Sequence, residues 1–553
     1  MKRILYVMVL FLVPGILTAA PWPNNEFFRA MNDEMQRTLK QLRLKGHPDP
    51  YYVAYWAKQS HSVNVRAQMG TLVPMADTSK NKIPVQISAL VSVGSDKEDA
   101  LNFVDASTYM PGVILSTRAS VPVGYESIRQ ALWELTDDIY LSVVNLYQAK
   151  KAYKQKKNIQ DKLPDIVPAK PGRFVEEIPP FQRPDLPRLE QAVKEMSALG
   201  NEIAFIENFS AGINSGRNDI YFLNSRGAFA QYMRPQVSLT LRASWRQPNG
   251  KKENEMLKYD LPDTSDASLA QMKVYAQEFL ARIERAHGAK SGDTYIGPVL
   301  LKPRMAATLL WNAILNDMQQ TKPLLRTDTH DDDDPSAGKL NKKRGVRVST
   351  DLLTIYDRPL ARDFEGIALA RFSPVDDEGV ASENITLVEN GYVKEIPLSQ
   401  RPISPKHRSN GHGFFDYFAM NVTVQSLRER LTNVFVEPKE QLTDRQMEEK
   451  LLARCRELGL EYGYIIYDGF GPLGIERIYT ADGHKETILD LNTDSDNFNF
   501  MPRDLRSVLA VGGKKELVHD YEVTITPSIL LSEMELVPKD PKPHRKPFIE
   551  RPK

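Results

Sequence analysis

A loop built around one histidine is the segment of this sequence best suited to chemistry. The run Ser409-Asn410-Gly411-His412-Gly413 places an imidazole between two glycines. Glycine tolerates positive φ, so the backbone can bend sharply here and present the ring. An imidazole titrates near neutral pH and is a common metal ligand, which makes His412 a candidate functional residue. The alternative interpretation is a surface turn with a solvated histidine.

Other histidines and carboxylates offer two further candidate metal sites. His330 precedes the acidic run 331–334, whose oxygens could hold a hard cation such as calcium. The spacing of an EF-hand is absent, however, and acidic runs of this kind are usually solvated loops. A zinc site could instead be assembled from scattered histidines, namely His407, His412, His484 and His519.

Motifs for nucleophilic catalysis and phosphate binding are absent from the sequence. It contains neither a Gly-x-Ser-x-Gly elbow nor a Gly-x-x-x-x-Gly-Lys-Ser/Thr loop, and the Gly-Lys pair within 511–515 is interpreted as a turn. Cys455 is the single cysteine, so no intrachain disulfide can form. It shares one helical face with Leu451 and Leu458, after a capping box at 443–446. This pattern predicts a buried core thiol.

Composition and the N-terminus limit the class of protein. The chain has 553 residues, of which 41% are hydrophobic and 26% charged, as expected for a globular protein of two or three domains. A formal charge of +1 provides no global field to recruit nucleic acid. Residues 1–20 have the basic start, apolar stretch and small-residue end of a signal peptide. We expect cleavage after Ala20 and export to the periplasm or medium, without stable membrane insertion; an uncleaved anchor is the alternative.

The segment 21–289 is predicted to form an α+β domain with an antiparallel sheet. Apolar periodicity predicts helices at 24–44, 127–156, 189–199 and 265–287. Alternating patterns predict strands at 51–56, 63–67, 83–93, 203–208, 219–224 and 237–245. The basic end of the long helix is interpreted as solvated. Prolines crowd 163–188, which indicates an extended connector.

The segment 290–537 is predicted to form a mainly β domain. It opens with a helix that begins at Pro303 and continues to Met318. Asn390-Gly391 supplies the two positive-φ positions of a type I′ hairpin, and another turn is expected at 481–483. The basic, proline-rich tail 538–553 has no apolar period, so disorder is expected there.

The order of several motifs resembles that of the TldD/PmbA family, whose members are also described as predicted zinc proteases or modulators of DNA gyrase. The run 376–413 contains an acidic-Glu-Gly start, the LVENG hairpin and the Gly-His-Gly loop. Further matches lie at 221–227, 295–301, 363–366 and 526–536. The resemblance implies an N-terminal sheet-and-helix domain, a mainly β C-terminal domain, and dimers enclosing a chamber for extended peptides.

Catalytic members of that family carry HExxxH on the helix after the Gly-Pro-Val segment, with two histidines on zinc and the glutamate acting on metal-bound water. Here those positions are Trp311, Asn312 and Asn316, none of which can do this work. Residues five apart diverge by about 140° on a regular helix, so such a site requires a local distortion. Cys455 does not match the family's later cysteine ligand. The chain therefore resembles the non-catalytic PmbA (TldE) type.

The leading hypothesis is a catalytically silent, peptide-binding subunit of a proteolytic complex, with no cofactor of its own and a zinc-bearing TldD-like partner. Gly411, His412 and Gly413 are predicted to contact extended or unfolded peptides. One alternative is an active zinc metallopeptidase with displaced ligands. The other is a non-enzymatic envelope scaffold that needs no such partner.

Overall fold

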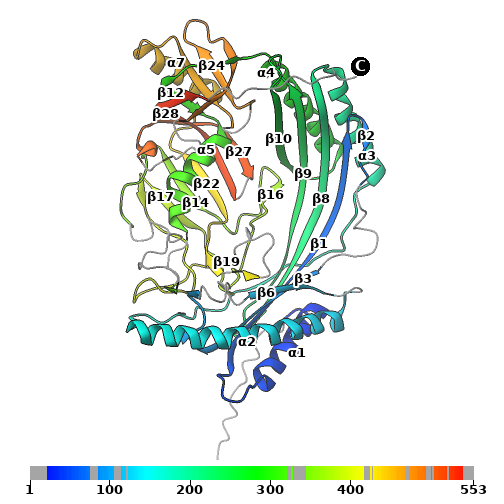
Figure 1. Ribbon diagram of the computed structural model, residues 1–553, viewed down its shortest axis with the longest axis vertical. Coiled ribbons are helices and arrows are strands. Elements are labelled where there is room, and N and C mark those ends of the chain that lie inside the picture. Colours follow the sequence, from blue (N-terminus) through cyan, green and yellow to red (C-terminus); the bar gives the residue numbers. More distant parts are fainter. Residues whose placement is uncertain are drawn as a thin grey trace, which may run out of the picture.

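The computed structural model has the α+β architecture expected from the sequence, with two large sheets and helices packed on them (Figure 1). The structure describes residues 22–74, 85–104, 114–119, 123–319, 325–327, 344–415, 424–425, 427–468, 472–493, 500, 503–519 and 522–539. The predicted signal peptide, the acidic run 331–334 with His330, and residues 540–553 of the tail lie outside these ranges. Within them, no helix combines the length and apolar character needed to cross a membrane.

The N-terminal sheet is dominated by long antiparallel strands. Its described strands follow the order β10-β9-β8-β1-β3-β6-β20, with β2, β4 and β7 paired at its sides. The bounds are β1 (Pro50–Gln68), β2 (Thr71–Leu72), β3 (Val85–Ser95), β4 (Glu98–Asp99), β6 (Ile114–Arg118), β7 (Arg173–Val175), β8 (Ile206–Asn224), β9 (Phe229–Arg246), β10 (Lys252–Leu261) and β20 (Val424–Gln425). A separate parallel pair joins β5 (Phe103–Val104) to β13 (Leu325–Arg326).

Two pairs of predicted strands prove to be single strands. The segments 51–56 and 63–67 are the two ends of β1, and 219–224 is the second half of a β8 that begins at Ile206. The polar residues between the predicted segments remain in the ladder because β1 and β8 pair continuously from Ala54 to Gln68. Cross-strand hydrogen bonds therefore override the break in hydrophobic alternation.

Four helices of the described residues lie on this sheet. α1 (Glu26–Gln41) and α2 (Tyr125–Lys157) share one apolar cluster with β1 and β3, whereas α3 (Leu186–Ala198) and α4 (Asp266–Ala286) share another with β8 and β9. Figure 1 shows α2 running across the lower end of the sheet beside α1. Each helix lies within a few residues of its predicted position. Ordinary caps begin two of them, since Asn25 accepts a bond from the Phe28 N–H and Ser265 one from the Ser268 N–H.

The basic end of α2 is not simply solvated, which corrects the expectation from the sequence. Lys150 and Lys154 are buried, and only the neighbouring lysines face solvent. Lys150 Nζ lies 2.6 Å from Asp165 Oδ2 and donates to the Leu101 carbonyl at 2.7 Å. Lys154 pairs with Glu98 and with Asp161. The start of the proline-rich connector thus packs against α2, and the carboxylates of Asp165, Asp161 and Glu98 make burial of these ammonium groups tolerable.

Removal of the Asp165 carboxylate tests this attachment. The side chains of Lys150 and Asp165 are only 3% and 8% exposed, so Asp165→Ala leaves a buried cation without this partner. We expect the free energy of unfolding to fall by roughly 3 kcal/mol in urea denaturation. Lys156→Ala, on the exposed side of the same helix end, should leave it unchanged. Equal stability of the two variants would contradict the proposed role of this ion pair.

The C-terminal sheet has mixed strand directions. Its described strands follow the order β11-β25-β24-β23-β12-β28-β22-β14-β17-β18, with β26 and β27 also paired to β28. The bounds are β11 (Lys290–Ser291), β12 (Tyr295–Leu301), β14 (Leu353–Asp357), β17 (Ile385–Glu389), β18 (Tyr392–Val393), β22 (Asn433–Pro438), β23 (Tyr462–Ile466), β24 (Ile475–Tyr479), β25 (Lys485–Leu489), β26 (Leu491–Thr493), β27 (Val508–His519) and β28 (Val523–Pro538). Small pairs join β15 (Asp363–Phe364) to β16 (Ile367–Ala368) and β19 (Gly413–Phe415) to β21 (Leu427–Glu429).

Several local predictions in this half are confirmed. Asn390 and Gly391 have φ of 50° and 80° and join β17 to β18 in a tight hairpin. Helix α7 (Asp444–Glu457) begins at the predicted capping box and buries Cys455 completely. Burial raises the pKa of that thiol, as expected for a core cysteine.

The prediction of a turn at 511–515 is wrong, because this run lies inside β27, where the pairing with β28 shifts register between Gly512 and Glu516.

Apolar packing crosses the predicted domain boundary near residue 289. The cluster beneath α1 and α2 includes Phe415 and Leu427, and the cluster beneath α3 and α4 includes Leu473 and Leu489. Strand β20 also pairs with β6 of the N-terminal sheet. The division into segments 21–289 and 290–537 therefore stays a prediction.

Candidate functional site

The helix that would carry a family metal motif is distorted at the motif itself. It runs from α5 (Pro303–Leu310) through a π-helical turn (Trp311–Leu315) into α6 (Asn316–Met318). The Asn316 N–H donates to the Trp311 carbonyl, which is the i→i+5 bond of a π turn. Such a bond brings residues five apart toward one side of the helix. The helix therefore has the distortion that two metal ligands spaced five residues apart would require.

The side chains on this turn do not fit a zinc ion. Trp311 Nε1 donates to Thr524 Oγ1 on β28 at 2.7 Å, so the indole contributes an N–H donor and no lone pair. Asn312 and Asn316 are exposed neutral amides. Neither amide can accept a proton from a metal-bound water at neutral pH. We derive no metal-dependent step from these residues.

The histidines proposed as an alternative zinc site have separate partners. His407 Nε2 lies 2.7 Å from the Ser399 carbonyl, His484 stacks on Tyr479, and His519 Nδ1 lies 3.0 Å from Asp260 Oδ2. Across the described part of the chain, no group of three or more His, Cys, Asp or Glu side chains is arranged to hold a metal ion.

The Gly-His-Gly loop is buried, so its interpretation as a solvated surface turn is wrong. His412 has no exposed surface, and its Nδ1 lies 2.9 Å from Asn410 Oδ1 and 3.0 Å from the Asn410 carbonyl. Glycine is required at both flanking positions because other parts of the chain approach them closely. A Cβ on Gly411 would meet the Ala381 carbonyl oxygen at 2.5 Å, and one on Gly413 would meet the Glu378 carboxylate at 2.6 Å.

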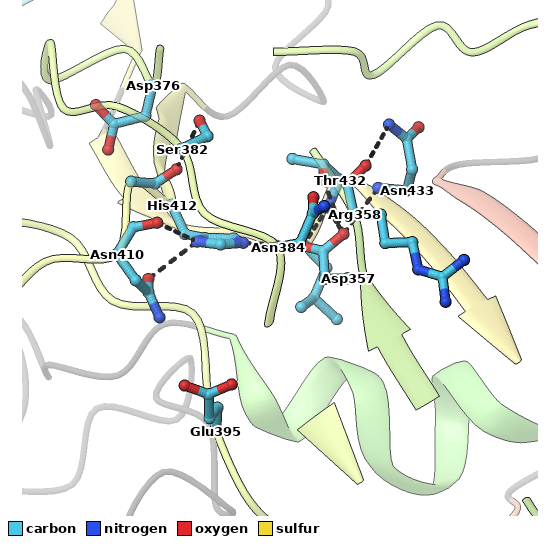
Figure 2. A network of polar contacts seen from close by, with 12 residues as sticks. Asp357, Arg358, Asp376, Ser382, Asn384, Glu395, Asn410, His412, Thr432 and Asn433 are labelled. Carbon is cyan, nitrogen blue, oxygen red and sulfur yellow. Dashed lines mark hydrogen bonds and ion pairs between the residues drawn. The ribbon is translucent and has the colours of Figure 1, made fainter. Parts of the chain in front are cut away.

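The other side of the imidazole faces Asp357, the last residue of β14 (Figure 2). Asp357 is fully buried and accepts bonds from the Thr432 N–H, the Thr432 hydroxyl at 2.7 Å and the Asn433 N–H at 2.9 Å. His412 Nε2 lies 3.2 Å from Asp357 Oδ2, but its orientation is unfavourable for a hydrogen bond. Backbone and hydroxyl donors therefore provide most of the solvation of this carboxylate.

Two further buried carboxylates lie in the loop that packs against Gly413. Asp376 accepts bonds from the Val380 N–H at 2.7 Å and the Gly413 N–H at 2.9 Å, and Glu378 accepts one from the Gln400 N–H at 2.6 Å. Burial raises the pKa of Glu378 from 4.5 to about 7. Burial, followed by repulsion from Glu378, also raises the pKa of Asp376. These carboxyl groups hold protons at unusually high pH.

This loop region also connects the two sheets. Asn224, at the end of β8, donates from its side chain to the Glu378 carbonyl at 3.4 Å. The Gly172 N–H donates to the Gly379 carbonyl at 2.8 Å, and the Val167 N–H donates to the Gln400 carbonyl at 2.8 Å. The proline-rich connector and the end of β8 thus contact the same loops that enclose His412.

The sequence identified His412 but not its surroundings. Asp357, Asp376 and Glu378 were not singled out as site residues, because an acidic residue at a strand end or in a loop has no sequence mark of burial. The glycines beside His412 were the available signal of tight packing. The contact of Gly411, His412 and Gly413 with peptide stays a prediction, and all three residues are buried within the protein.

Loss of the Asp357 carboxylate should strongly destabilise the folded protein. Asp357→Ala leaves the buried Thr432 and Asn433 donors without their acceptor, so we expect the free energy of unfolding to fall by roughly 3–5 kcal/mol. Asp351→Ala, near the other end of β14, removes a solvent-exposed carboxylate and should leave the melting temperature unchanged. Similar melting curves for both variants would show that the buried network contributes little.

The raised pKa of Glu378 predicts a pH dependence. Between pH 4.5 and about 7 the folded chain holds a proton that the unfolded chain has lost, so stability should fall as pH rises through this window. Denaturation of the parent and of Glu378→Gln at several pH values measures the difference. The variant should lose less stability across the window. A parallel pH dependence in both proteins would exclude Glu378 as the titrating group.

Residues 293–537 match the family described as the PmbA/TldA metallopeptidase C-terminal domain. No curated protein matches the sequence. TldE from Thermococcus kodakarensis is a structural relative with 14% identity and a TM-score of 0.57, covering 92% of this chain and 100% of its own.

Two other solved structures share the fold, and both proteins are described as candidate modulators of DNA gyrase. The one from Thermotoga maritima has 13% identity and a TM-score of 0.60, covering 92% of this chain and 100% of its own. The one from Bacteroides thetaiotaomicron has 14% identity and a TM-score of 0.56, covering 92% and 98%. The segment 293–537 thus matches the PmbA/TldA metallopeptidase C-terminal domain, and the chain as a whole shares the fold of these structures.

Proposed function

We propose that this chain is an exported, catalytically silent member of its family that binds extended peptides within a proteolytic complex. The observation that carries the proposal is the π turn at Trp311–Leu315. The backbone there has the distortion that a five-residue metal spacing needs, whereas the side chains are an indole and two amides. A helix that has the backbone shape of the metal site but lacks its metal-binding side chains favours a role in binding over a role in bond cleavage.

The sheet edges support peptide binding as the retained activity. β10 is the terminal strand of the described N-terminal sheet, and Met256 on it is 53% exposed. An extended peptide can add to such an edge through main-chain hydrogen bonds, which place few demands on its sequence. Such binding suits a subunit that holds unfolded chains without cutting them. A zinc-bearing TldD-like partner would then supply the cleavage.

Metal analysis and a peptidase assay test catalytic silence. The purified chain should contain far less than one zinc per molecule and should leave unfolded peptides intact, because Trp311, Asn312 and Asn316 supply neither ligands nor a base. Trp311→Phe, which keeps an aromatic ring, should have equally little activity in both assays. Stoichiometric zinc together with chelator-sensitive cleavage by the chain alone would establish the active-peptidase alternative.

A mixing experiment separates the subunit from a scaffold. Peptide cleavage by a zinc-bearing homologue from the same cell should increase when this chain is added, and the two proteins should co-elute. A stable homo-oligomer that neither binds peptide nor associates with that homologue would favour the scaffold. N-terminal sequencing of the exported protein, with Pro21 expected as its first residue, tests the proposal of export.

A further inference from the structure

The outer face of α2 exposes two large apolar side chains. Trp133 and Leu141 are 47% and 53% exposed, on the side of the helix away from the apolar cluster that its inner side joins. They lie about two turns apart along the helix. Tryptophan is enriched at the buried centre of protein–protein interfaces. This face of α2 is therefore a candidate interaction surface.

The exposed charges of α2 are divided between its two halves. The acidic residues precede Leu141 and the lysines follow it: Glu126, Glu134, Asp137 and Asp138 in the first half, and Lys151, Lys156 and Lys157 in the second. The helix dipole favours acidic residues in the first turn and basic residues in the last. It does not account for Glu134, Asp137 and Asp138, which lie nearer the middle of the helix. The division of charge thus extends beyond what the dipole favours.

These outward charges are not paired within the chain. The three exposed lysines have no carboxylate within ion-pair distance among the described residues, whereas the buried Lys154 between them has two. Glu134 accepts a hydrogen bond at 3.1 Å from the neutral amide of Gln130. Arg129 lies toward α1, 3.6 Å from Glu34, and not on the outer face. The outer face therefore presents an acidic half and a basic half to solvent.

The spacing along α2 suits antiparallel pairing with a second copy. Trp133 and Lys151 are five turns apart at 3.6 residues per turn, so they project from the same side of the helix. A two-fold axis across the helix at the level of Ser142, next to its midpoint, brings Trp133 of one copy opposite Lys151 of the other. Glu134 lies one residue from that level, so its carboxylate can reach the same ammonium group. Because the arrangement is symmetric, each contact occurs twice.

Leu141 occupies the centre of this arrangement. The two copies of Leu141 meet beside the axis, with one Trp133 on each side of them. Each indole packs against the aliphatic stem of Lys151 and presents its ring to the ammonium group. An apolar centre with charged ends is the usual composition of a protein–protein interface.

We propose that the outer face of α2 binds the same face of a second copy of this chain, with the two helices antiparallel. A strip about 50 Å long and about 10 Å wide buries roughly 500 Å² on each copy, which is at the lower end for a specific interface. An anionic lipid surface fits this face less well, since it would repel the acidic half. Figure 1 shows α2 at the lower end of the molecule, away from α5 and β10, so the pairing leaves both of these elements open.

Sedimentation velocity of the full chain over a range of concentrations tests the pairing. The parent should form dimers. Glu134→Lys and Lys151→Glu should each raise the dimer dissociation constant at least about tenfold, because each variant places like charges opposite each other twice. An equimolar mixture of the two variants should dimerise as well as the parent, since both pairs then join opposite charges again. This rescue requires an antiparallel arrangement that brings these two positions together.

Trp133→Ser should also weaken the dimer, whereas Glu195→Lys, on the exposed surface of α3, should not. Thermal melts check that each variant folds. A parent that stays monomeric, a dimer that no α2 variant weakens, or two weakened variants that do not rescue each other would overturn the proposal. Binding of a monomer to anionic vesicles, abolished by Trp133→Ser, would assign this face to a membrane and overturn it as well. The proposed peptide binding does not depend on any of these outcomes.

Discussion

The cost of burying carboxylates determines how the C-terminal loops of this protein are built. Asp357 and Asp376 lie in the interior, where a charged or hydrogen-bonding group without partners is strongly destabilising. Their partners are mostly backbone N–H groups from residues distant in sequence, such as Thr432 and Gly413. Backbone donors have fixed positions, so the loops must converge with little tolerance. The close approach at Gly411 and Gly413 follows from this requirement.

This constraint also joins the two halves of the chain. The loop bearing Glu378 bonds to the end of β8 and to the proline-rich connector, which itself is fixed to α2 by a buried ion pair. Polar contacts at such a junction are sensitive to geometry, whereas the surrounding apolar clusters supply most of the favourable free energy.

Scaffold and chemistry are separable in this molecule. The π turn lies in a helix whose motif positions are Trp311, Asn312 and Asn316, and the Trp311 indole bonds to Thr524 on a central strand. A π turn is uncommon and is frequently found at functional sites. Its presence here together with Asn312 and Asn316 shows that backbone geometry alone does not establish a reaction. Function has to be argued from the side chains that the geometry presents.

Much of the local structure was determined by the sequence by itself. The α+β class, the Asn390-Gly391 hairpin, the capped helix with buried Cys455 and the unsuitability of Trp311 for zinc all follow from residue type and spacing, because each depends on neighbours within a few positions. Features that depend on distant partners were not predictable. The hydrophobic pattern predicts two strands at 51–56 and 63–67, whereas continuous pairing with β8 makes them one strand, β1.

Which polar residues are buried depends on how distant segments pack together. A solvated turn was one alternative for His412, and a solvated helix end was expected around Lys150, yet each of these side chains is buried beside a carboxylate from elsewhere in the chain. The charge of a side chain is visible in the sequence, whereas its solvation depends on which segments fold against it. Since those segments are many residues away, the burial of these side chains and the pKa shifts that follow from burial are properties of the assembled fold.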